Sequence, residues 1–267
     1  MRRRLATPET VILAALVALV VGGLAFGGGK KSSSGTDQTA GAKAAAARVA
    51  PIARRVETIR ALRFKHLPKP LIVTSAQTRR DSLADIDRSG SAADRREAAQ
   101  VLELLGLLQP GTDLRKVAGE ISGGQVAGYY DTRRKRLAIV AGPGAGSGVL
   151  SEITLAHELD HALEDQRLGL KDQASSGADD AVSAYTALVE GSATSVMDDY
   201  TRRFIDPGAA LGSAFSALGP SASSTKSIPP YLMASLLFSY VSGEKFVNRL
   251  RDIAHGWKLV NYALQKR

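Results

Sequence analysis

The sequence predicts an α+β protein, with a small mixed sheet early in the chain and a mainly helical C-terminal part. Two observations predict this fold class. Short strand-like runs occupy the first half, as LIVTS at 71–75 and QVAGYYDTRRKRLAIVAG at 125–142. Helical patterns dominate from residue 148 onward, and no segment of the chain repeats another. Strands and helices that occupy separate parts of a chain are typical of α+β folds.

The first 29 residues are predicted to form a signal anchor. Three arginines precede an uncharged run, whose apolar part, Val11–Phe26, approaches the roughly 20 residues that span a bilayer as a helix. No small-x-small cleavage site follows, and a lipoprotein is excluded because the chain has no cysteine. We expect a single-pass protein of the cell membrane, with an N-terminal transmembrane helix and its C-terminal domain outside the cytoplasm. A cleaved signal peptide is the alternative.

Residues 30–50 are predicted to be a flexible basic linker, because Gly, Ser, Ala and Lys dominate them. Positive charge is concentrated at this end. Residues 1–65 hold 12 Lys and Arg against 3 Asp and Glu, whereas residues 66–267 hold 23 of each kind. The basic segment suits anionic lipid headgroups, and a solvated tether is the alternative. The folded part has no basic excess, so we expect no nucleic-acid partner.

The folded domain is expected at residues 51–267. It begins with a helix near Pro51, where apolar residues recur at helical spacing until Pro68 and Pro70 stop it. A strand at 71–75 and an amphipathic helix at 92–108 follow.

Two short strands are then expected around a polar turn at Asp131–Lys135. A helix from about Asp179 or Asp180 to Phe204, a long loop at 206–230 and a further helix complete the predicted domain.

The segment SEITLAHELDHALEDQ, residues 151–166, holds two of the four histidines. Ser151 is the expected N-cap of a helix. His157 and His161 are one turn apart, so both imidazoles can reach one metal ion. Glu158 is rotated about 100° from His157, so it can reach a metal-bound water without being a ligand. This is the His-Glu-x-x-His pattern of zinc hydrolases. The alternative is two helix histidines that cap the helix or pair with acids.

A catalytic zinc site needs a third protein ligand. Glu164 shares the histidine stripe, but it lies about 10 Å along the axis of an unbroken helix from His157. His66 and His255 stand in no repeating structural context. These three residues are therefore weaker candidates than a glutamate on the next predicted helix.

Glu190 is the preferred third ligand. It is followed by Gly191, Ser192 and Ala193. A glycine inside a helix costs about 1 kcal/mol relative to alanine, which makes sense if the metal-bearing helix must pack closely there. The alternative is an exposed helix glutamate beside an incidental glycine.

These motifs resemble those of the gluzincin class of zinc metallopeptidases, in which a His-Glu-x-x-His helix is followed by a Glu-Gly-x-Ala helix. More closely, residues 52–264 are similar to a family of uncharacterised bacterial membrane or secreted proteins assigned as metallopeptidases. The matching pieces are GYYD (128–131), HELDHALEDQ (157–166), ALVEGSAT (187–194), IPPYL (228–232), FSYVSGEKFV (238–247) and GW (256–257).

The resemblance implies a zincin-like fold, with His157, His161 and Glu190 as ligands of Zn²⁺ and Glu158 as the general base. The implied activity is hydrolysis of a peptide or protein substrate by zinc-activated water. In gluzincins a strand before the metal helix binds substrate by strand addition, and RLAIVAG, residues 136–142, occupies that position.

Tyr240 and His255 are candidates for stabilising the oxyanion, although each has a structural role as its alternative.

Ser192 stands where the family usually has aspartate, and this change would weaken a hydrogen bond that supports a ligand histidine. Two other functions are therefore retained. One is a catalytically weak or inactive binding or assembly module with structural zinc at the cell envelope, and the other is an envelope scaffold without metal.

Overall fold

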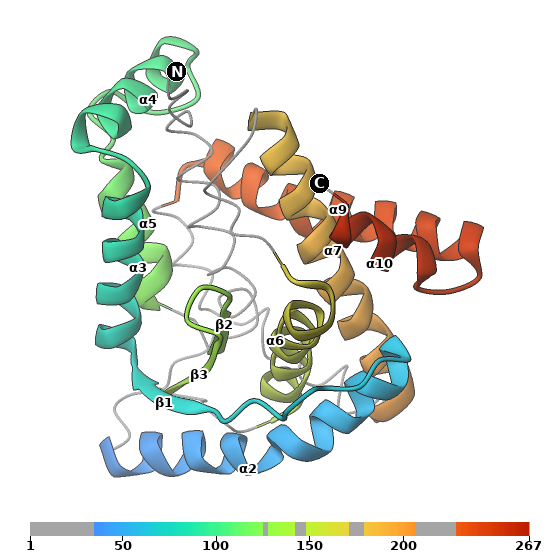
Figure 1. Ribbon diagram of the computed structural model, residues 1–267. Coiled ribbons are helices and arrows are strands. Elements are labelled where there is room, and N and C mark those ends of the chain that lie inside the picture. Colours follow the sequence, from blue (N-terminus) through green and yellow to red (C-terminus); the bar gives the residue numbers. More distant parts are fainter. Residues whose placement is uncertain (1–34, 125–127, 142–147, 171–178, 207–227, 267) are drawn as a thin grey trace.

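The computed structural model describes residues 35–124, 128–141, 148–170, 179–206 and 228–266 (Figure 1). The predicted anchor at 1–29 lies outside them. Among the residues that are described, no helix is both long and apolar enough to cross a membrane.

The architecture is α+β, as predicted, with one small mixed sheet and a majority of helices. The three strands are β1 (Leu71–Thr74), β2 (Gly128–Asp131) and β3 (Arg136–Ala141). Their order is β1-β3-β2, with β1 parallel and β2 antiparallel to β3. The predicted turn between β2 and β3 is present, and Lys135 adopts the left-handed conformation there, with a φ of 51°.

The central position of β3 overturns one expectation. Substrate was predicted to pair with residues 136–142, but both edges of β3 are already paired, with Val73 opposite Val140 on one side and Tyr129 opposite Ala138 on the other. Residue 142 lies outside the described part of the chain. An added strand therefore has to use the outer edge of β2 or β1.

Helix α2 (Gly35–Arg60) begins earlier than the sequence indicates. The predicted flexible linker is wrong for residues 35–50, which are helical. Ala42, Ala45 and Val49 are buried and extend the apolar stripe that continues at Ile52 and Val56. Alanine is the best helix former but adds little apolar surface, so the sequence of an alanine-rich helix is easily mistaken for a flexible linker. In Figure 1, α2 runs along one side of the sheet and meets α6.

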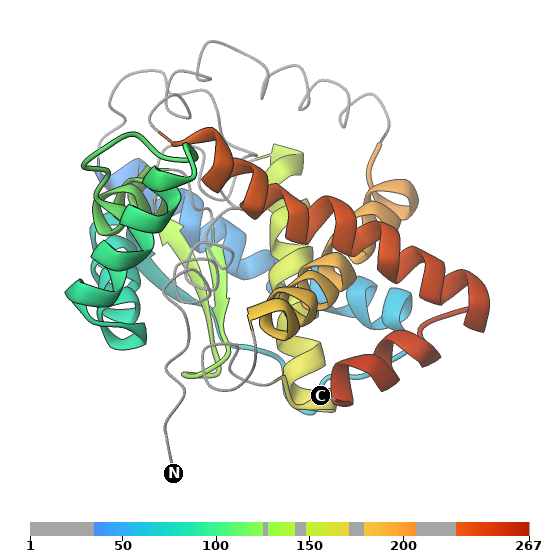
Figure 2. The same cartoon turned by 90° about the horizontal axis from the view of Figure 1, so that it is seen from above.

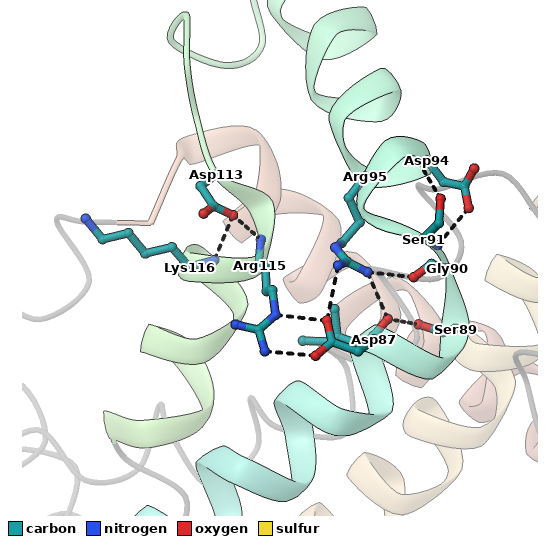
Figure 3. A network of polar contacts seen from close by, with 10 residues as sticks. Asp87, Ser89, Gly90, Ser91, Asp94, Arg95, Asp113, Arg115 and Lys116 are labelled. Atoms are coloured by element: carbon teal, nitrogen blue, oxygen red, sulfur yellow. Dashed lines mark hydrogen bonds and ion pairs between the residues drawn. The ribbon is translucent and has the colours of Figure 1, made fainter.

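Three helices form a lobe beside the sheet: α3 (Ser75–Ser89), α4 (Ala92–Leu104) and α5 (Leu114–Gly124). Only α4 was predicted, and it begins at a capping box in which Ser91 and Asp94 exchange hydrogen bonds. The Asp87 carboxylate joins the three helices, because it accepts hydrogen bonds from Arg115 at 2.8 and 2.9 Å and from Arg95 at 3.1 Å (Figure 3). Helix α3 has no clear apolar stripe in the sequence, because only Thr78 and Ile86 are buried in it, and it was therefore not predicted.

The helical half contains α6 (Gly148–Leu168), α7 (Asp179–Phe204), α9 (Pro230–Ala254) and α10 (Lys258–Gln265). Helix α6 begins at Gly148, so Ser151 is a buried residue inside the helix and not its N-cap as predicted. Most of the predicted loop at 206–230 lies outside the described residues. Helix α9 packs along α7 and extends from the α3–α5 lobe to α10 (Figure 2).

Candidate metal centre

The centre of α6 carries the two histidines of the His-Glu-x-x-His pattern. The helix is buried on nearly every side, and His157 is only 1% exposed. One helical turn separates it from His161, so the two rings meet edge to face, with centroids 4.6 Å apart. Their Nε2 atoms are 3.0 Å apart. Two imidazole nitrogens at this distance share at most one proton between them.

Glu190 on α7 completes a group of three donors, as predicted. Its Oε2 atom lies 3.2 Å from His157 Nε2 and 3.6 Å from His161 Nε2. Zinc binds nitrogen and oxygen at about 2.0–2.2 Å, so two ligands of a tetrahedral ion are about 3.3 Å apart. The observed spacings of 3.0, 3.2 and 3.6 Å bracket that value. These buried residues could therefore hold a metal ion.

Burial and mutual charge shift the pKa values of all three donors. Burial lowers the pKa of His157 to about 4, so this ring is neutral at pH 7. Burial also opposes the charged forms of His161 and Glu190, but the attraction between these two groups is stronger. This attraction raises the pKa of His161 to about 10 and lowers the pKa of Glu190 to about 2. A metal ion that binds here has to displace the proton held by His161.

Glu158 lies between α6 and the sheet. It is 5% exposed, and its Oε2 atom accepts a 2.7 Å hydrogen bond from the backbone N–H of Tyr130 on β2. Burial raises the pKa of Glu158 to about 7. This carboxylate is therefore poised near neutral pH, which suits a general base. The Tyr130 hydroxyl also donates to Asp165 at 2.7 Å, so β2 is held against α6 at two points.

His157 and His161 have weak support at their Nδ1 atoms. A metal-binding histidine usually donates its other N–H to a carboxylate or carbonyl oxygen. Here His157 Nδ1 faces the sulfur of Met197 at 3.1 Å, a poor acceptor. Within the described part of the chain, His161 Nδ1 has no hydrogen-bond partner. The ring positions therefore depend on how α6 and α7 pack together.

Among the described contacts, Ser192 gives no hydrogen bond to either histidine, in line with the weak support expected from serine in place of aspartate. Its hydroxyl donates to Glu164 at 2.6 Å and accepts from Arg60 at 2.9 Å, so it supports an ion-pair cluster and not a ligand histidine. Glu164 itself is paired with Arg60 at 2.5 Å and is not one of the three converging donors. Its exclusion as a ligand on helical geometry agrees with this position.

Gly191 lies at a close helix crossing, but its neighbour is α9 and not the metal-bearing helix. A Cβ atom at Gly191 would overlap the backbone of Gly243, and one at Gly243 would overlap the carbonyl of Ala187. The expectation that this glycine admits α6 is therefore wrong. The glycine pair brings α9, which carries Tyr240, close to the helix of Glu190.

Of the other residues that the sequence suggested for the site, Tyr240 lies beside it, and His255 and His66 do not belong to it. The ring of Tyr240 is buried, with its centroid 6.1 Å from that of His157. His255 is an exposed residue in the left-handed conformation that ends α9, and His66 is exposed before β1. Neither belongs to the metal-binding group.

The sequence analysis missed Tyr130 as a backbone donor, Met197 and Arg60. Tyr130 lies within GYYD (128–131), but that motif does not indicate which group its backbone N–H contacts, and Met197 and Arg60 have no recognisable pattern around them. No protein-family model, curated protein or solved structure matches this chain. The likeness to the gluzincins therefore stays a prediction, and the function is inferred below from the geometry of the site.

Proposed function

We propose that this protein is a zinc-dependent metallopeptidase with a zincin-like fold. The observation that carries the proposal is the convergence of His157, His161 and Glu190 at tetrahedral spacing, with Glu158 one residue from the first ligand. Three protein ligands of this kind are typical of catalytic zinc sites, in which a further position is open to water or substrate.

Glu158 is the proposed general base. A zinc ion at this site would supply a Lewis acid and lower the pKa of water toward 7. A carboxylate with a pKa of about 7 can accept a proton from the attacking water and deliver it to the leaving amine. The N–H of Tyr130 fixes the orientation of this carboxylate at 2.7 Å.

The outer edge of β2 is the proposed platform for the substrate backbone. The N–H of Tyr130 points away from β3, toward Glu158, and Gly128 presents its backbone to the same side because the strand alternates. An extended peptide that pairs with this edge would lie next to the general base. The proposed oxyanion stabiliser is Tyr240, because its ring lies beside His157.

The location proposed for the enzyme is the cell membrane, with the apolar run Val11–Phe26 as the anchor. The arginines that precede the run favour a catalytic domain outside the cytoplasm, and Lys30 and Lys31 on its other flank reduce this bias. Reporter fusions at the C-terminus test the orientation, since one reporter is active only in the cytosol and another only outside it. Activity of the cytosolic reporter would reverse the proposed topology.

Metal analysis combined with peptide cleavage tests the proposed activity. The full-length chain should bind one zinc ion and cleave casein or members of a peptide library. Glu158→Gln should retain the metal and lose cleavage, because it removes the base but no ligand. Glu152→Gln is the matched control on the same helix, where the residue pairs with Arg55 away from the metal ligands. Loss of zinc in Glu158→Gln would mean that this residue is a ligand.

A binding or assembly module with structural zinc is the second candidate. The weak support of both histidines at Nδ1 favours it, since catalytic sites usually orient their ligands with oxygen acceptors. Stoichiometric zinc without any cleavage by the wild-type chain would select this function.

A further inference from the structure

Arg60, in the last turn of α2, has a fully buried charge. Its side chain is 0% exposed. One guanidinium nitrogen, Nη1, donates to both oxygens of Asp160 at 2.8 Å, to Glu164 at 2.5 Å and to Ser192 at 2.9 Å. The other, Nη2, donates to Asn261 of α10 at 2.7 Å. A single side chain therefore joins α2, α6, α7 and α10.

The partners of Arg60 are immediate neighbours of the metal ligands. Asp160 precedes His161 on α6, and Ser192 follows Glu190 by two residues on α7. The guanidinium thus contacts each of the two helices close to a residue of the proposed metal site, His161 on α6 and Glu190 on α7. The contacts to both helices come from Nη1 alone, while Asn261 holds the other nitrogen, Nη2. A lysine ammonium on its flexible stem has no second nitrogen to anchor it in this way.

Among the described hydrogen bonds of the two histidines, none supports an Nδ1 atom through an oxygen. His157 Nδ1 faces only the sulfur of Met197, and His161 Nδ1 has no hydrogen-bond partner among the described residues. The distance between the histidines and Glu190 is then set by the packing of α6 on α7, and Arg60 is bonded to both helices.

We propose that Arg60 is the positioning residue of the metal centre, which holds His161 and Glu190 at coordinating distance through Asp160 and Ser192. This inference rests on the proposed zinc site. It assigns to a residue of α2, 100 positions before Asp160, the control of metal affinity and coordination geometry.

Arg55 offers a matched control. It lies on the same helix and also joins α6 to α7, through Glu152 at 2.7 Å and the Tyr200 hydroxyl at 2.8 Å. It differs in that its partners are not adjacent to a metal ligand. A purely structural role of helix-bridging arginines predicts similar results at both positions.

The test compares Arg60→Lys with Arg55→Lys in the full-length chain. Zinc affinity is measured by competition with a chromophoric chelator, and the visible spectrum of the Co²⁺-loaded protein reports coordination geometry. Arg60→Lys should weaken zinc binding about 10- to 100-fold and alter the Co²⁺ spectrum, as changes to the residues that orient metal ligands do. Arg55→Lys should stay within about twofold of wild type, because its partners orient no ligand. Far-ultraviolet circular dichroism reports whether the helices are intact, because the fluorescence of Trp257, whose ring lies 4.2 Å from the Arg60 guanidinium, would respond to the substitution itself.

Wild-type affinity and an unchanged spectrum in a folded Arg60→Lys protein would overturn the inference, as would an equal loss in Arg55→Lys. If Arg60→Lys does not fold, Ser192→Ala decides, because it removes the link from Arg60 to α7, together with the hydrogen bond from Ser192 to Glu164, and leaves the ion pairs of Arg60 with Asp160 and Glu164 in place. A changed Co²⁺ spectrum in that variant supports the inference, and an unchanged one overturns it. Failure of the wild-type chain to bind Zn²⁺ or Co²⁺ would instead refute the proposed function.

Discussion

Two neighbouring parts of α6 bury acidic and basic groups in different ways. The first contains His157 and His161, which face Glu190. The second contains Asp160, which precedes His161, and Glu164, which follows it by three residues, and both face Arg60. In the second part the chain provides a permanent cation, whereas in the first the described ion pairs of Glu190 are with the two histidines alone. A buried carboxylate needs a cation, and a histidine can exchange its proton for a metal ion. Arg60 thus pairs with Asp160 and Glu164, whereas Glu190 pairs with the two histidines.

The largest effect is expected from removal of the permanent cation. Arg60→Met leaves Asp160 and Glu164 buried without their partner, and breaking a buried ion pair in this way costs about 3–5 kcal/mol. Urea denaturation of the metal-free protein measures the loss. A free energy of unfolding within 1 kcal/mol of the wild-type value would show that the two acids are not held by charge, and the contrast between the two parts of α6 would disappear.

Loss of the third ligand should act on the metal instead. Glu190→Ala removes both a charge and a coordinating oxygen, so zinc affinity should fall by orders of magnitude, about 100-fold or more. Glu190→Asp keeps the charge on a shorter side chain and should fall between the alanine variant and wild type. Chelator competition measures both. Retention of zinc by Glu190→Ala would remove this residue from the site.

Proton release sharpens the comparison further. Between pH 5.5 and 8, His157 is neutral with a pKa of about 4, Glu190 is ionised with a pKa of about 2, and His161 holds a proton with a pKa of about 10. Each zinc ion should therefore displace about one proton from the ligands, and affinity should rise about tenfold per pH unit. Titration calorimetry in buffers of different ionisation enthalpy counts the protons. An affinity independent of pH would contradict the charge state assigned to His161.

The smallest effect is expected at Arg55. Its side chain is 40% exposed and pairs with Glu152, and exposed ion pairs contribute about 0.2–1 kcal/mol. Thermal denaturation of Arg55→Met should therefore show a slight decrease in stability, with little change in zinc affinity. A loss as large as that of Arg60→Met would mean that burial does not distinguish the two arginines.

Local features could be predicted from the sequence because their geometry depends on neighbours along the chain. The spacing of His157 and His161 follows from 3.6 residues per turn, and the structure brings their nitrogens to 3.0 Å. The two strands around Asp131–Lys135 follow from residue composition and a polar turn. Even the exclusion of Glu164 needed only the rise of a helix.

Tertiary structure decided everything that depends on which elements meet. The central place of β3 is set by pairing with Leu71–Thr74, more than sixty residues earlier, and no pattern within 136–141 encodes it. The glycine at position 191 indicates a close helix crossing, but only the tertiary structure shows that the other helix is α9, with Gly243 at the contact.

The contrast is sharpest for the charges of the site. The sequence by itself determined that one helix turn presents two histidines and a glutamate, because helical periodicity is a local property. It did not determine that Arg60 would pair with Asp160 and Glu164, because an arginine about 100 residues away has no local signature. Burial makes that pairing obligatory, since a charge removed from water requires a partner, and only the packing of α2 against α6 and α7 provides one.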